Sequence, residues 1–580
     1  MGLTHARWEA KPLEEGARSL ARSREIPLLI AHLLWHRGLR EAEELDAFLR
    51  PTLQQMPDPA TLTDAPRAAR RILDALATDE TVMIYGDYDA DGITSAALLT
   101  LFFRRCFKVE PKVYLPQRLR DGYGLSVAAV ERVAAEGVKL LLTVDNGSSA
   151  IEAAARAREL GIDLIIIDHH QVSDPEPAAF AHLNPNRPSC AFREKGLAAV
   201  GVAFMLLVEL RRQLDEDQRF SLPRPALQEL LDIVSLGTVV DVAPMRGLNR
   251  ALTVAGLKQL RETRWPGLRA LCAETGVHPH AVNGRALGFK LGPPINASGR
   301  LGDPGLGYRL LCAEAPEEAA RYARELMEKN KHRRTLQDAL LEEVMPLAEA
   351  EAAAGRSAIV LADESWHQGI VGIVAGRLAD QFLRPAFLLG GSAEEGLLKG
   401  SARGGSAGLN LKRCLDRCAE HLTSHGGHRE AAGLGLYRGS FEAFRERLDE
   451  VVREELAEAA GQVLEVDAEV SPAHLDWSVF DGLEQLMSPF GAQNPSPRFL
   501  CRGVHGALST FSEGRHLRLR FARGSAPLRE SVWWGHGELI SSLGGGPYDL
   551  IGSLEQREWR GERWLQLRLD ALRPHTPGAQ

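Results

Sequence analysis

The sequence predicts an α/β protein in which a parallel-sheet domain is joined by long helices to a smaller α/β domain and then to an all-β domain. Three observations predict this order. Short apolar runs alternate with helical segments in the first half, an Ala-, Glu- and Arg-rich tract occupies 315–354, and short strands with Gly-rich turns follow from about residue 465. At about 150 residues per domain, 580 residues suggest roughly four domains.

The N-terminal half is predicted to form a helical segment and a parallel sheet. Residues 1–60 carry apolar side chains at helical spacing in IPLLIAHLLWHRGLREAEELDAFL. A first α/β domain is expected at 61–312, with apolar runs at TVMIY (81–85), KLLLTV (139–144) and DLIIID (163–168). These runs do not alternate with polar residues, so they indicate strands covered on both faces, as in a parallel sheet.

Three further segments complete the predicted organisation. Residues 313–355 contain few helix breakers and are expected to form one or two connector helices. A second α/β domain is expected at 356–462, with a Gly-rich turn, KGSARGGSAG, at 399–408. In 463–580 the segments HLRLRFA, ESVWW and RWLQLRLDAL predict a small barrel or sandwich.

Composition indicates a globular protein of a reducing compartment. The chain is 44% hydrophobic and 25% charged, with seven cysteines and no CxxC pair, which argues against zinc fingers and a disulfide framework. It shows no secretory signal and no apolar run near the ~20 residues of a membrane span, so we expect a cytoplasmic protein. The net charge of −8 is unlike that of a basic nucleic-acid-binding domain, although cations at an acidic site offset part of it.

Four segments place carboxylates or imidazoles where a strand or helix is predicted to end. They are YGDYDADG with Asp87, Asp89 and Asp91, TVDNG with Asp145, IIIDHH with Asp168, His169 and His170, and GTVVD with Asp241. Ligands of an open parallel sheet bind at the carboxyl ends of its strands, so these side chains are expected to meet.

Clustered carboxylates repel one another, and divalent cations remove that cost. Carboxylates with one or two imidazoles suit Mn²⁺ or Mg²⁺ better than structural zinc. Two such ions roughly 3.5–4 Å apart activate water and clamp phosphoryl oxygens, which predicts a metal-dependent phosphoesterase without a Ser or Cys nucleophile. A single Asp after a strand is usually a turn or N-cap residue, and that alternative stays open for Asp87 or Asp145 taken alone.

The same motifs, in the same order, resemble those of the DHH phosphoesterase superfamily, and SHGGHREAAG (424–433) resembles the GGH motif of its DHHA1 domain. Within the superfamily the chain is most similar to the RecJ family of single-strand DNA exonucleases. This resemblance runs from about residue 20 to 573 and includes the segments LPQRLRDGYGL (115–125), NPNRP (184–188), GPPINASGR (292–300) and PFGAQNPSPRF (489–499).

The resemblance implies a 5′-to-3′ exonuclease that degrades single-stranded DNA to 5′-mononucleotides in DNA repair and recombination. It implies two divalent cations, Mn²⁺ in preference to Mg²⁺, and a DHH domain, a DHHA1 domain and an OB-fold that together bind DNA. Whether DNA lies in an open groove or a closed hole stays open. The expected partners are a single-strand-binding protein and a recombination helicase, and the chain is expected to be a monomer without membrane contact.

The family motifs also imply a role for each site residue. Asp145 would bridge the two ions, Asp168 would orient a ligand, and His170 would contact the scissile phosphate. The implied catalytic residues are His170, Asp145 and His169. The implied metal ligands are Asp89, Asp91, Asp145, His169 and Asp241, with Asp87 as a further ligand or a partner of water.

DNA contacts are implied in all three domains. The candidates are Arg118, Tyr123, Asn296, Arg300, Ser401, Arg403, His428, Arg518 and Arg520. Tyr123 is equally readable as an ordinary turn aromatic, and Arg518 and Arg520 as a solvated strand face. Trp533, Trp534 and Trp564 are expected in the core. The chain departs from the family pattern at Pro294, Gly404 and His425, which puts fine contacts in doubt and leaves the metal motifs intact.

Two other functions remain open. A DHH phosphodiesterase acting on short oligonucleotides or cyclic dinucleotides would commonly lack the connector and the C-terminal barrel. A catalytically inactive DNA-binding scaffold would have lost acidic or histidine ligands, which are all present here.

Overall fold

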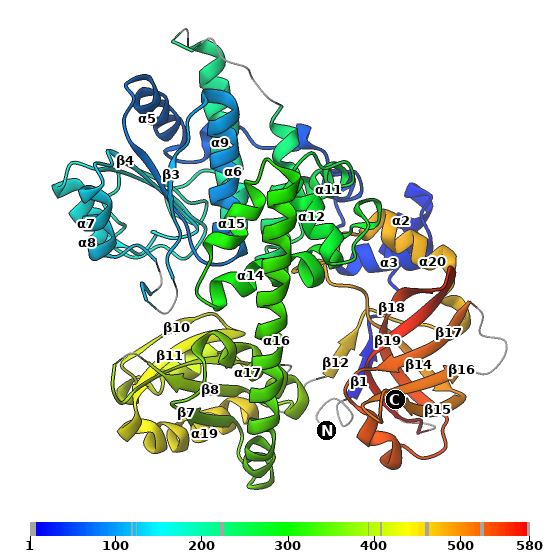
Figure 1. The fold of residues 1–580 in the computed structure, drawn as a ribbon. Coiled ribbons are helices and arrows are strands. Elements are labelled where there is room, and N and C mark those ends of the chain that lie inside the picture. Colours follow the sequence, from blue (N-terminus) through cyan, green and yellow to red (C-terminus); the bar gives the residue numbers. More distant parts are fainter. Residues whose placement is uncertain are drawn as a thin grey trace. The chain divides into compact units, whose positions relative to one another are not determined.

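The computed structural model describes residues 7–117, 120–122, 124–217, 219–220, 226–392, 394–405, 409–458, 463–521 and 527–576. The chain divides into two compact units, each described by itself (Figure 1). Asp46–Arg334 and Pro489–Pro495 form what we call the parallel-sheet unit. Met1–Leu45, Thr335–Ser488 and Ser496–Gln580 form the mixed-sheet unit.

A five-stranded sheet organises the parallel-sheet unit. Its strands lie in the order β3-β2-β4-β5-β6, and every neighbouring pair is parallel. The strands are β2 (Val82–Tyr85), β3 (Lys112–Tyr114), β4 (Leu140–Val144), β5 (Asp163–Ile167) and β6 (Ala181–Leu183). The carboxyl ends of all five strands therefore lie at one edge of the sheet.

Helices cover both faces of this sheet (Figure 1). Ile84 and Leu142 pack on one face against α5 (Ala65–Ala77), α6 (Ala90–Phe107) and α9 (Ala199–Glu216). Met83 and Leu141 pack on the other face against α7 (Val127–Ala135) and α8 (Ile151–Glu159). Successive strand residues point to opposite faces, so burial on both sides requires an apolar residue at nearly every position. The predicted parallel sheet is confirmed.

The rest of the unit is helical. Its further elements are η1 (Leu53–Gln55), η2 (Pro59–Thr61), η3 (Leu227–Leu230), α10 (Leu231–Val240), α11 (Gly247–Leu260), α12 (Pro266–Glu274), η4 (Pro279–Ala281), α13 (Gly284–Ala286), the π-helical turn η5 (Leu287–Leu291), α14 (Gly292–Arg300) and α15 (Gly305–Leu311). The end of α10 carries Asp241, as the sequence predicts for GTVVD.

Close packing at one glycine holds α10 against its neighbours. A Cβ atom on Gly237 would lie 2.2 Å from Thr94 Oγ1 in α6 and 2.8 Å from Val200 Cγ1 in α9. Both distances are shorter than any ordinary carbon contact. The absence of a side chain at Gly237 therefore lets α6, α9 and α10 meet, and α6 and α10 carry metal-motif residues at their ends.

A long helix leads into a five-stranded sheet of the mixed-sheet unit; residues up to Arg334 of this helix belong to the parallel-sheet unit, and Thr335 onward to the mixed-sheet unit. Helix α16 (Pro316–Ala353) is a single helix where one or two were expected. The sheet has the order β10-β11-β9-β8-β7, with β7 (Ile359–Asp363), β8 (Ala386–Gly391), β9 (Leu397–Arg403), β10 (Ser424–Gly427) and β11 (Ala431–Tyr437). Its helices are α17 (Gln368–Phe382), α18 (Leu411–Asp416) and α19 (Phe441–Glu458). No described helix is long and apolar enough to traverse a bilayer.

The predicted Gly-rich turn at 399–408 is wrong for its first half. Ser401 and Arg403 lie in β9, which pairs with β8 and β11 along its length. The glycine that suggested a turn has a packing role, because a Cβ on Gly400 would lie 2.4 Å from the carbonyl oxygen of Leu388. Residues 406–408 lie outside the described residues.

A seven-stranded sheet follows in the order β13-β14-β18-β19-β17-β16-β15, as expected for an all-β C-terminal domain. Its strands are β13 (Ala468–Glu469), β14 (Phe499–Val504), β15 (Gly506–Phe511), β16 (His516–Phe521), β17 (Leu528–Trp533), β18 (Tyr548–Trp559) and β19 (Glu562–Pro574). Helix α20 (Trp477–Gly482) and the turns η9 (Pro472–His474), η10 (Leu483–Met487) and η11 (Gly537–Ser542) accompany them.

The N-terminal segment is not wholly helical, which corrects the expectation for 1–60. Its helices are α2 (Glu15–Arg24), α3 (Leu28–His36) and α4 (Ala42–Leu49), but β1 (Arg7–Ala10) precedes them. Strand β1 pairs in parallel with β12 (Val463–Val466). A pairing partner more than 450 residues away leaves no local pattern in four residues.

We predict that Gly237→Ala destabilises the protein. Replacing Gly by Ala in a helix stabilises it by about 1 kcal/mol through helix propensity. Overpacking a buried contact costs ~1–3 kcal/mol of folding free energy. Here the cost should dominate, because two neighbouring helices must shift. Urea unfolding measures the balance. Gly201→Ala in α9 is the matched control, because its Cβ would meet Leu197 Cδ2 at an ordinary 3.4 Å. Equal or greater stability of Gly237→Ala would contradict the close-packing argument.

Candidate metal centre

The acidic and histidine motifs meet at the carboxyl edge of the parallel sheet. Asp87 follows β2, Asp145 follows β4, and Asp168 follows β5. Asp89 and Asp91 lie at the start of α6, and Asp241 lies at the end of α10. In three groups, ligand atoms lie within 4.8 Å of one another: Asp145, Asp168, His169 and His170; Asp91, His169 and Asp241; and Asp87, Asp89 and Asp145.

Asp145 links two of these groups, and its surroundings are those of a ligand. It is 1% exposed and has a positive φ of 63°. Its main-chain N–H donates to Ile167 O in β5 at 3.0 Å, which holds the residue at the sheet edge. Asp145 Oδ1 lies 3.3 Å from His169 Nε2 and 3.7 Å from His170 Nδ1. Among the described residues, this buried oxygen accepts no hydrogen bond.

The two carboxylates at the start of α6 also organise helices. Asp89 caps α6, and its Oδ1 accepts the amide of Asp91 at 3.0 Å and that of Gly92 at 3.2 Å. Asp91 accepts the amides of Ala199 at 2.6 Å and Val200 at 2.9 Å, at the first turn of α9. The positive end of the α9 dipole therefore faces this carboxylate.

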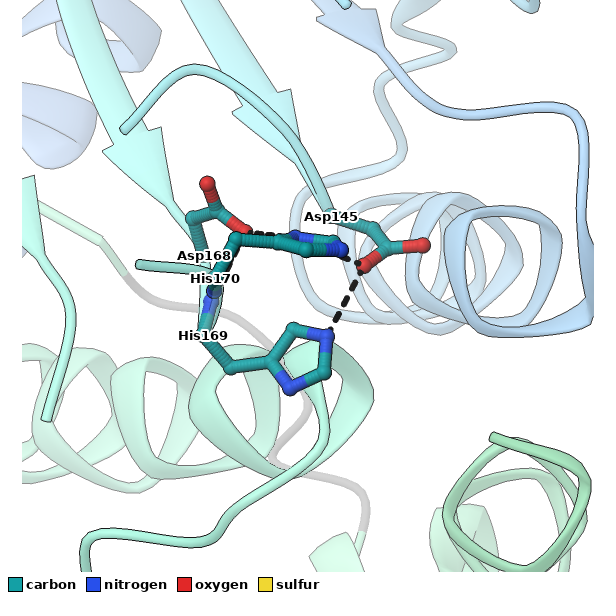
Figure 2. A group of neighbouring side chains, drawn as sticks. All are labelled: Asp145, Asp168, His169 and His170. Atoms are coloured by element: carbon teal, nitrogen blue, oxygen red, sulfur yellow. Dashed lines mark hydrogen bonds and ion pairs between the residues drawn. The ribbon is translucent and has the colours of Figure 1, made fainter. Parts of the chain in front are cut away.

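Asp168 holds the two histidines in place (Figure 2). Its Oδ1 accepts the amides of His169 at 2.7 Å and His170 at 3.2 Å, and Nδ1 of the His170 ring at 2.8 Å. Its Oδ2 accepts the amide of Ser148 at 3.0 Å. With Nδ1 donating to Asp168, the Nε2 atom of His170 lies on the opposite side of the ring.

Burial and mutual repulsion raise the pKa values of the clustered carboxyl groups. Burial, and then the charges of the neighbouring aspartates, raise the pKa of Asp145 well above its ordinary value. Burial with the charges of Asp91 and Asp89 does the same to the pKa of Asp241. Burial with the charge of Asp89 raises the pKa of Asp91 to about 7 against the two amides of α9.

The Asp168–His170 pair shifts in the opposite sense. Burial acts to raise the pKa of Asp168, but the hydrogen bond and charge of His170 overcome it and hold that pKa well below its usual range. Burial acts to lower the pKa of His170, and the hydrogen bond from its ring to Asp168, with the nearby carboxylates, raises it on balance. His170 is therefore protonated up to a higher pH than an ordinary histidine.

The donor set fits divalent cations. Carboxylate oxygens dominate, imidazole is the other donor, and no cysteine belongs to the three groups. The raised pKa values show that these oxygens lack compensating positive charge, and Asp145 Oδ1 is buried without a hydrogen bond from any described residue. Hard oxygen-rich sites of this kind suit Mn²⁺ and Mg²⁺.

The predicted DNA contacts are spread over both units. Arg118 and Tyr123 lie outside the described residues. Asn296 and Arg300 lie on α14, where Asn296 Oδ1 accepts the amide of Ala90 at 2.8 Å beside the acidic loop. Ser401, Arg403 and the exposed His428 belong to the mixed-sheet unit.

In the C-terminal sheet, Arg518 and Arg520 share one face of β16, with Leu517 and Leu519 buried on the other, as predicted. Arg518 lies over the ring of Phe511 at 5.0 Å. Trp533 is buried, but Trp534 is 42% exposed and packs edge-on against His516, so its assignment to the core is wrong. A Trp-Trp pair at the end of a strand turns one ring inward and the other outward.

Four residues near the histidines were not predicted from the sequence. They are Ser148, His182, Asn184 and Asn186. Asn186 Nδ2 donates to His169 O at 2.5 Å, and Asn184 Nδ2 donates to His170 O at 2.9 Å. Asn after a strand is an ordinary turn residue, so only the family-like segment at 184–188 signalled them.

Comparison with known families covers most of the chain. Residues 81–238 match the DHH family, N-terminal domain; residues 355–454 match the DHHA1 domain; and residues 466–571 match the RecJ OB domain. This order agrees with the fold class that the sequence predicts.

Similar proteins extend over nearly its whole length. The single-stranded-DNA-specific exonuclease RecJ of Dickeya dadantii is 36% identical over 95% of this chain and 96% of its own. The crystal structure of RecJ from Thermus thermophilus in complex with Mn²⁺ has a TM-score of 0.81 and 31% identity, over 98% of this chain and 80% of that one. Its Mg²⁺ complex has a TM-score of 0.75 and 30% identity, over 99% and 79%.

We predict that Asp145→Asn stabilises the metal-free protein. A carboxyl whose pKa is higher in the folded than in the unfolded chain binds more protons when folded, so it destabilises the fold increasingly as pH rises above the ordinary value of about 4. Removing the charge should raise Tm by about 2 °C or more at pH 8, and by less at pH 5.

Thermal unfolding in EDTA at pH 5, 6, 7 and 8 tests this. Asp79→Asn is the matched control, because Asp79 also has a positive φ, of 53°, but is exposed. If Asp145→Asn does not raise Tm, or raises it more at pH 5 than at pH 8, the charged Asp145 does not destabilise the metal-free fold and the prediction is wrong.

Proposed function

Because the chain belongs to the RecJ family of single-stranded-DNA-specific exonucleases, we propose that it removes nucleotides one at a time from the 5′ end of single-stranded DNA. The products are 5′-mononucleotides, and the activity serves DNA repair and recombination. The observation that carries this proposal is the convergence of carboxylates and imidazoles from four separated segments at one edge of the sheet.

These side chains hold two divalent cations, Mn²⁺ in preference to Mg²⁺. Such ions lower the pKa of water and neutralise charge on phosphoryl oxygens. The ligands are Asp89, Asp91, Asp145, His169 and Asp241, with Asp87 as a further ligand or a partner of water. Asp145 would be the ligand shared by the two ions, since it belongs both to the group with Asp168, His169 and His170 and to the group with Asp87 and Asp89.

The chain's own residues position the scissile phosphate. The water oxygen bonds to phosphorus and the P–O3′ bond breaks, so O3′ of the terminal nucleotide takes up a proton and leaves as a 3′-hydroxyl. The scissile phosphate stays on the 5′ oxygen of the shortened strand, and the released nucleotide keeps the 5′-phosphate that it already carried. His170, held at Nδ1 by Asp168 with a pKa raised by that hydrogen bond and the nearby carboxylates, would donate from Nε2 to a non-bridging oxygen. This donor stabilises the negative charge that develops there.

The choice of the 5′ end is assigned to Ser401 and Arg403 in the mixed-sheet unit. They lie on β9 beside Gly372 of α17, where a Cβ would come within 2.9 Å of Ser401 Oγ and 3.2 Å of Arg403 Nη2. The missing side chain lets a hydroxyl and a guanidinium lie directly against α17. Such a pair suits a terminal phosphate.

The rest of the strand is bound by basic and aromatic side chains. In the OB domain, Arg518 lies over the ring of Phe511, which clusters with His516 and Trp534, and the exposed Arg520 shares the face of β16 with Arg518. Rings stack with bases and cations attract the backbone, which binds single strands without sequence preference. Arg300 and His428 are further proposed contacts. Proposed protein partners are a single-strand-binding protein and a recombination helicase, with the chain itself a monomer.

We predict progressive release of mononucleotides from the 5′ end. The experiment digests single strands labelled at either end, with Mn²⁺, using wild type and Asp145→Ala. Loss of the bridging carboxylate should lower the rate by at least ~100-fold. Release from the 3′ end contradicts the polarity, and an unaffected Asp145→Ala contradicts the metal assignment. Preference for dinucleotides or cyclic dinucleotides over long strands would indicate the alternative phosphodiesterase.

We predict that Gly372→Ala reduces the preference for a 5′-phosphorylated strand over a 5′-hydroxyl strand by about 10-fold, through loss of one charge-assisted contact. The measurement is kcat/KM on both strands. Gly376→Ala, one turn later in α17, is the matched control, since its Cβ would meet only Arg403 Cγ, at 3.8 Å. An unchanged preference in Gly372→Ala, or an equal loss in both variants, rejects this pocket.

A further inference from the structure

The segment after β6 contacts the main chain of both motif histidines. Asn184 Nδ2 donates to His170 O at 2.9 Å, and Asn186 Nδ2 donates to His169 O at 2.5 Å. Asn184 Oδ1 accepts the amide of Asn186 at 2.8 Å, so the two side chains hold one another in place. We call this pair the asparagine clamp.

The clamp completes a set of restraints that Asp168 begins. Asp168 Oδ1 accepts the amides of His169 and His170, and the clamp binds their carbonyl oxygens. The main-chain N–H and C=O groups of both histidines are thereby hydrogen-bonded. Such restraint sets where the imidazoles point before any ligand binds.

A buried relay joins the clamp to Asp168. Asn184 Nδ2 also donates to Ser148 Oγ at 2.8 Å, and the Ser148 amide donates to Asp168 Oδ2 at 3.0 Å. Ser148 Oγ lies 3.0 Å from His182 Nε2. Because the amide NH₂ can only donate, the serine hydroxyl accepts from Asn184, and its own proton is free to be donated to His182 Nε2.

The state of His182 agrees with this direction. Burial, and then the charge of Arg187, lower the pKa of His182 to about 4, so the ring is neutral near pH 7. A neutral ring that accepts at Nε2 carries its proton on Nδ1, which lies 3.8 Å from Glu176 Oε2. Ser148, Asn184 and Asp168 are each no more than 1% exposed, so water does not compete for these bonds.

We propose that Asn184 and Asn186 are positioning residues that hold His169 and His170 in the geometry needed to bind the metal and the scissile phosphate. The proposal rests on the proposed function, since it concerns the same centre. Partners of this kind typically change metal affinity or activity by ~10–100-fold when removed. In this role the clamp acts through the histidines.

The experiment compares Asn186→Ala and Asn184→Ala with wild type. Asn186 is exposed, so its loss leaves the fold intact, whereas Asn184 is fully buried and tests the stronger restraint. Asn283→Ala is the matched control, because this exposed asparagine also makes one side-chain bond to the main chain, from Ala286 N at 2.9 Å, away from the histidines. The readouts are Mn²⁺ affinity from the EPR signal of free Mn²⁺, kcat and KM on single-stranded DNA, and Tm in EDTA.

We expect each clamp variant to bind Mn²⁺ about 10-fold more weakly and to lose about 10-fold in kcat, with KM within about 2-fold of wild type. Tm of Asn186→Ala, and the Mn²⁺ affinity, kcat and KM of Asn283→Ala, should match wild type. Mn²⁺ affinity and kcat within about 2-fold of wild type in both clamp variants overturn the proposal. So does a change confined to KM or Tm.

The two levels of inference fail in different ways. If wild type shows no Mn²⁺-dependent nuclease activity, or Asp145→Ala retains it, the proposed function fails. If wild type is active, Asp145→Ala is inactive and both clamp variants behave as wild type, only the positioning role fails.

Discussion

Mutual repulsion among buried carboxylates is the constraint on which the site depends. The parallel sheet brings the ends of β2, β4 and β5 together, and the aspartates that follow them cannot all be charged without a compensating cation. Main-chain amides offset part of this negative charge: amides at the start of α9 donate to Asp91, and an amide at the start of α6 donates to Asp89. The remaining uncompensated charge is what divalent cations would neutralise at this centre.

Much of this was predictable from sequence because the relevant signals are local. Non-alternating apolar runs indicate doubly covered strands, and Asp145 and Asp168 each follow such a run directly. The motif order was sufficient to predict the fold class and the set of side chains that the structure brings together. The aspartates that follow strands could be expected to lie together without knowing how the helices pack, because the strand ends of a parallel sheet share an edge.

What escaped prediction depends on partners distant in sequence. Strand β1 forms by pairing with β12, which lies far away in the sequence. Gly400 has the sequence context of a turn glycine, and only the structure shows that it packs against β8. Asn184 and Asn186 could not be distinguished from turn residues, because their role depends on carbonyl groups 14 and 17 residues earlier. Residues that bind a metal are recognisable by their chemistry, whereas residues that orient them are recognisable only by contacts.

The hydrogen bonds between Asp91 and α9 have a consequence for the order in which such a protein would lose its site residues during evolution. Its carboxylate satisfies the amides of Ala199 and Val200, so its replacement would leave two buried donors without a partner. The Asp241 carboxylate has no comparable structural role in accepting buried main-chain amides from described residues, and its side chain is partly exposed. In a lineage released from selection for catalysis, drift should therefore erase Asp241 early and Asp91 late. A descendant that retains Asp91 while lacking Asp241 would record the order in which a nuclease became a scaffold.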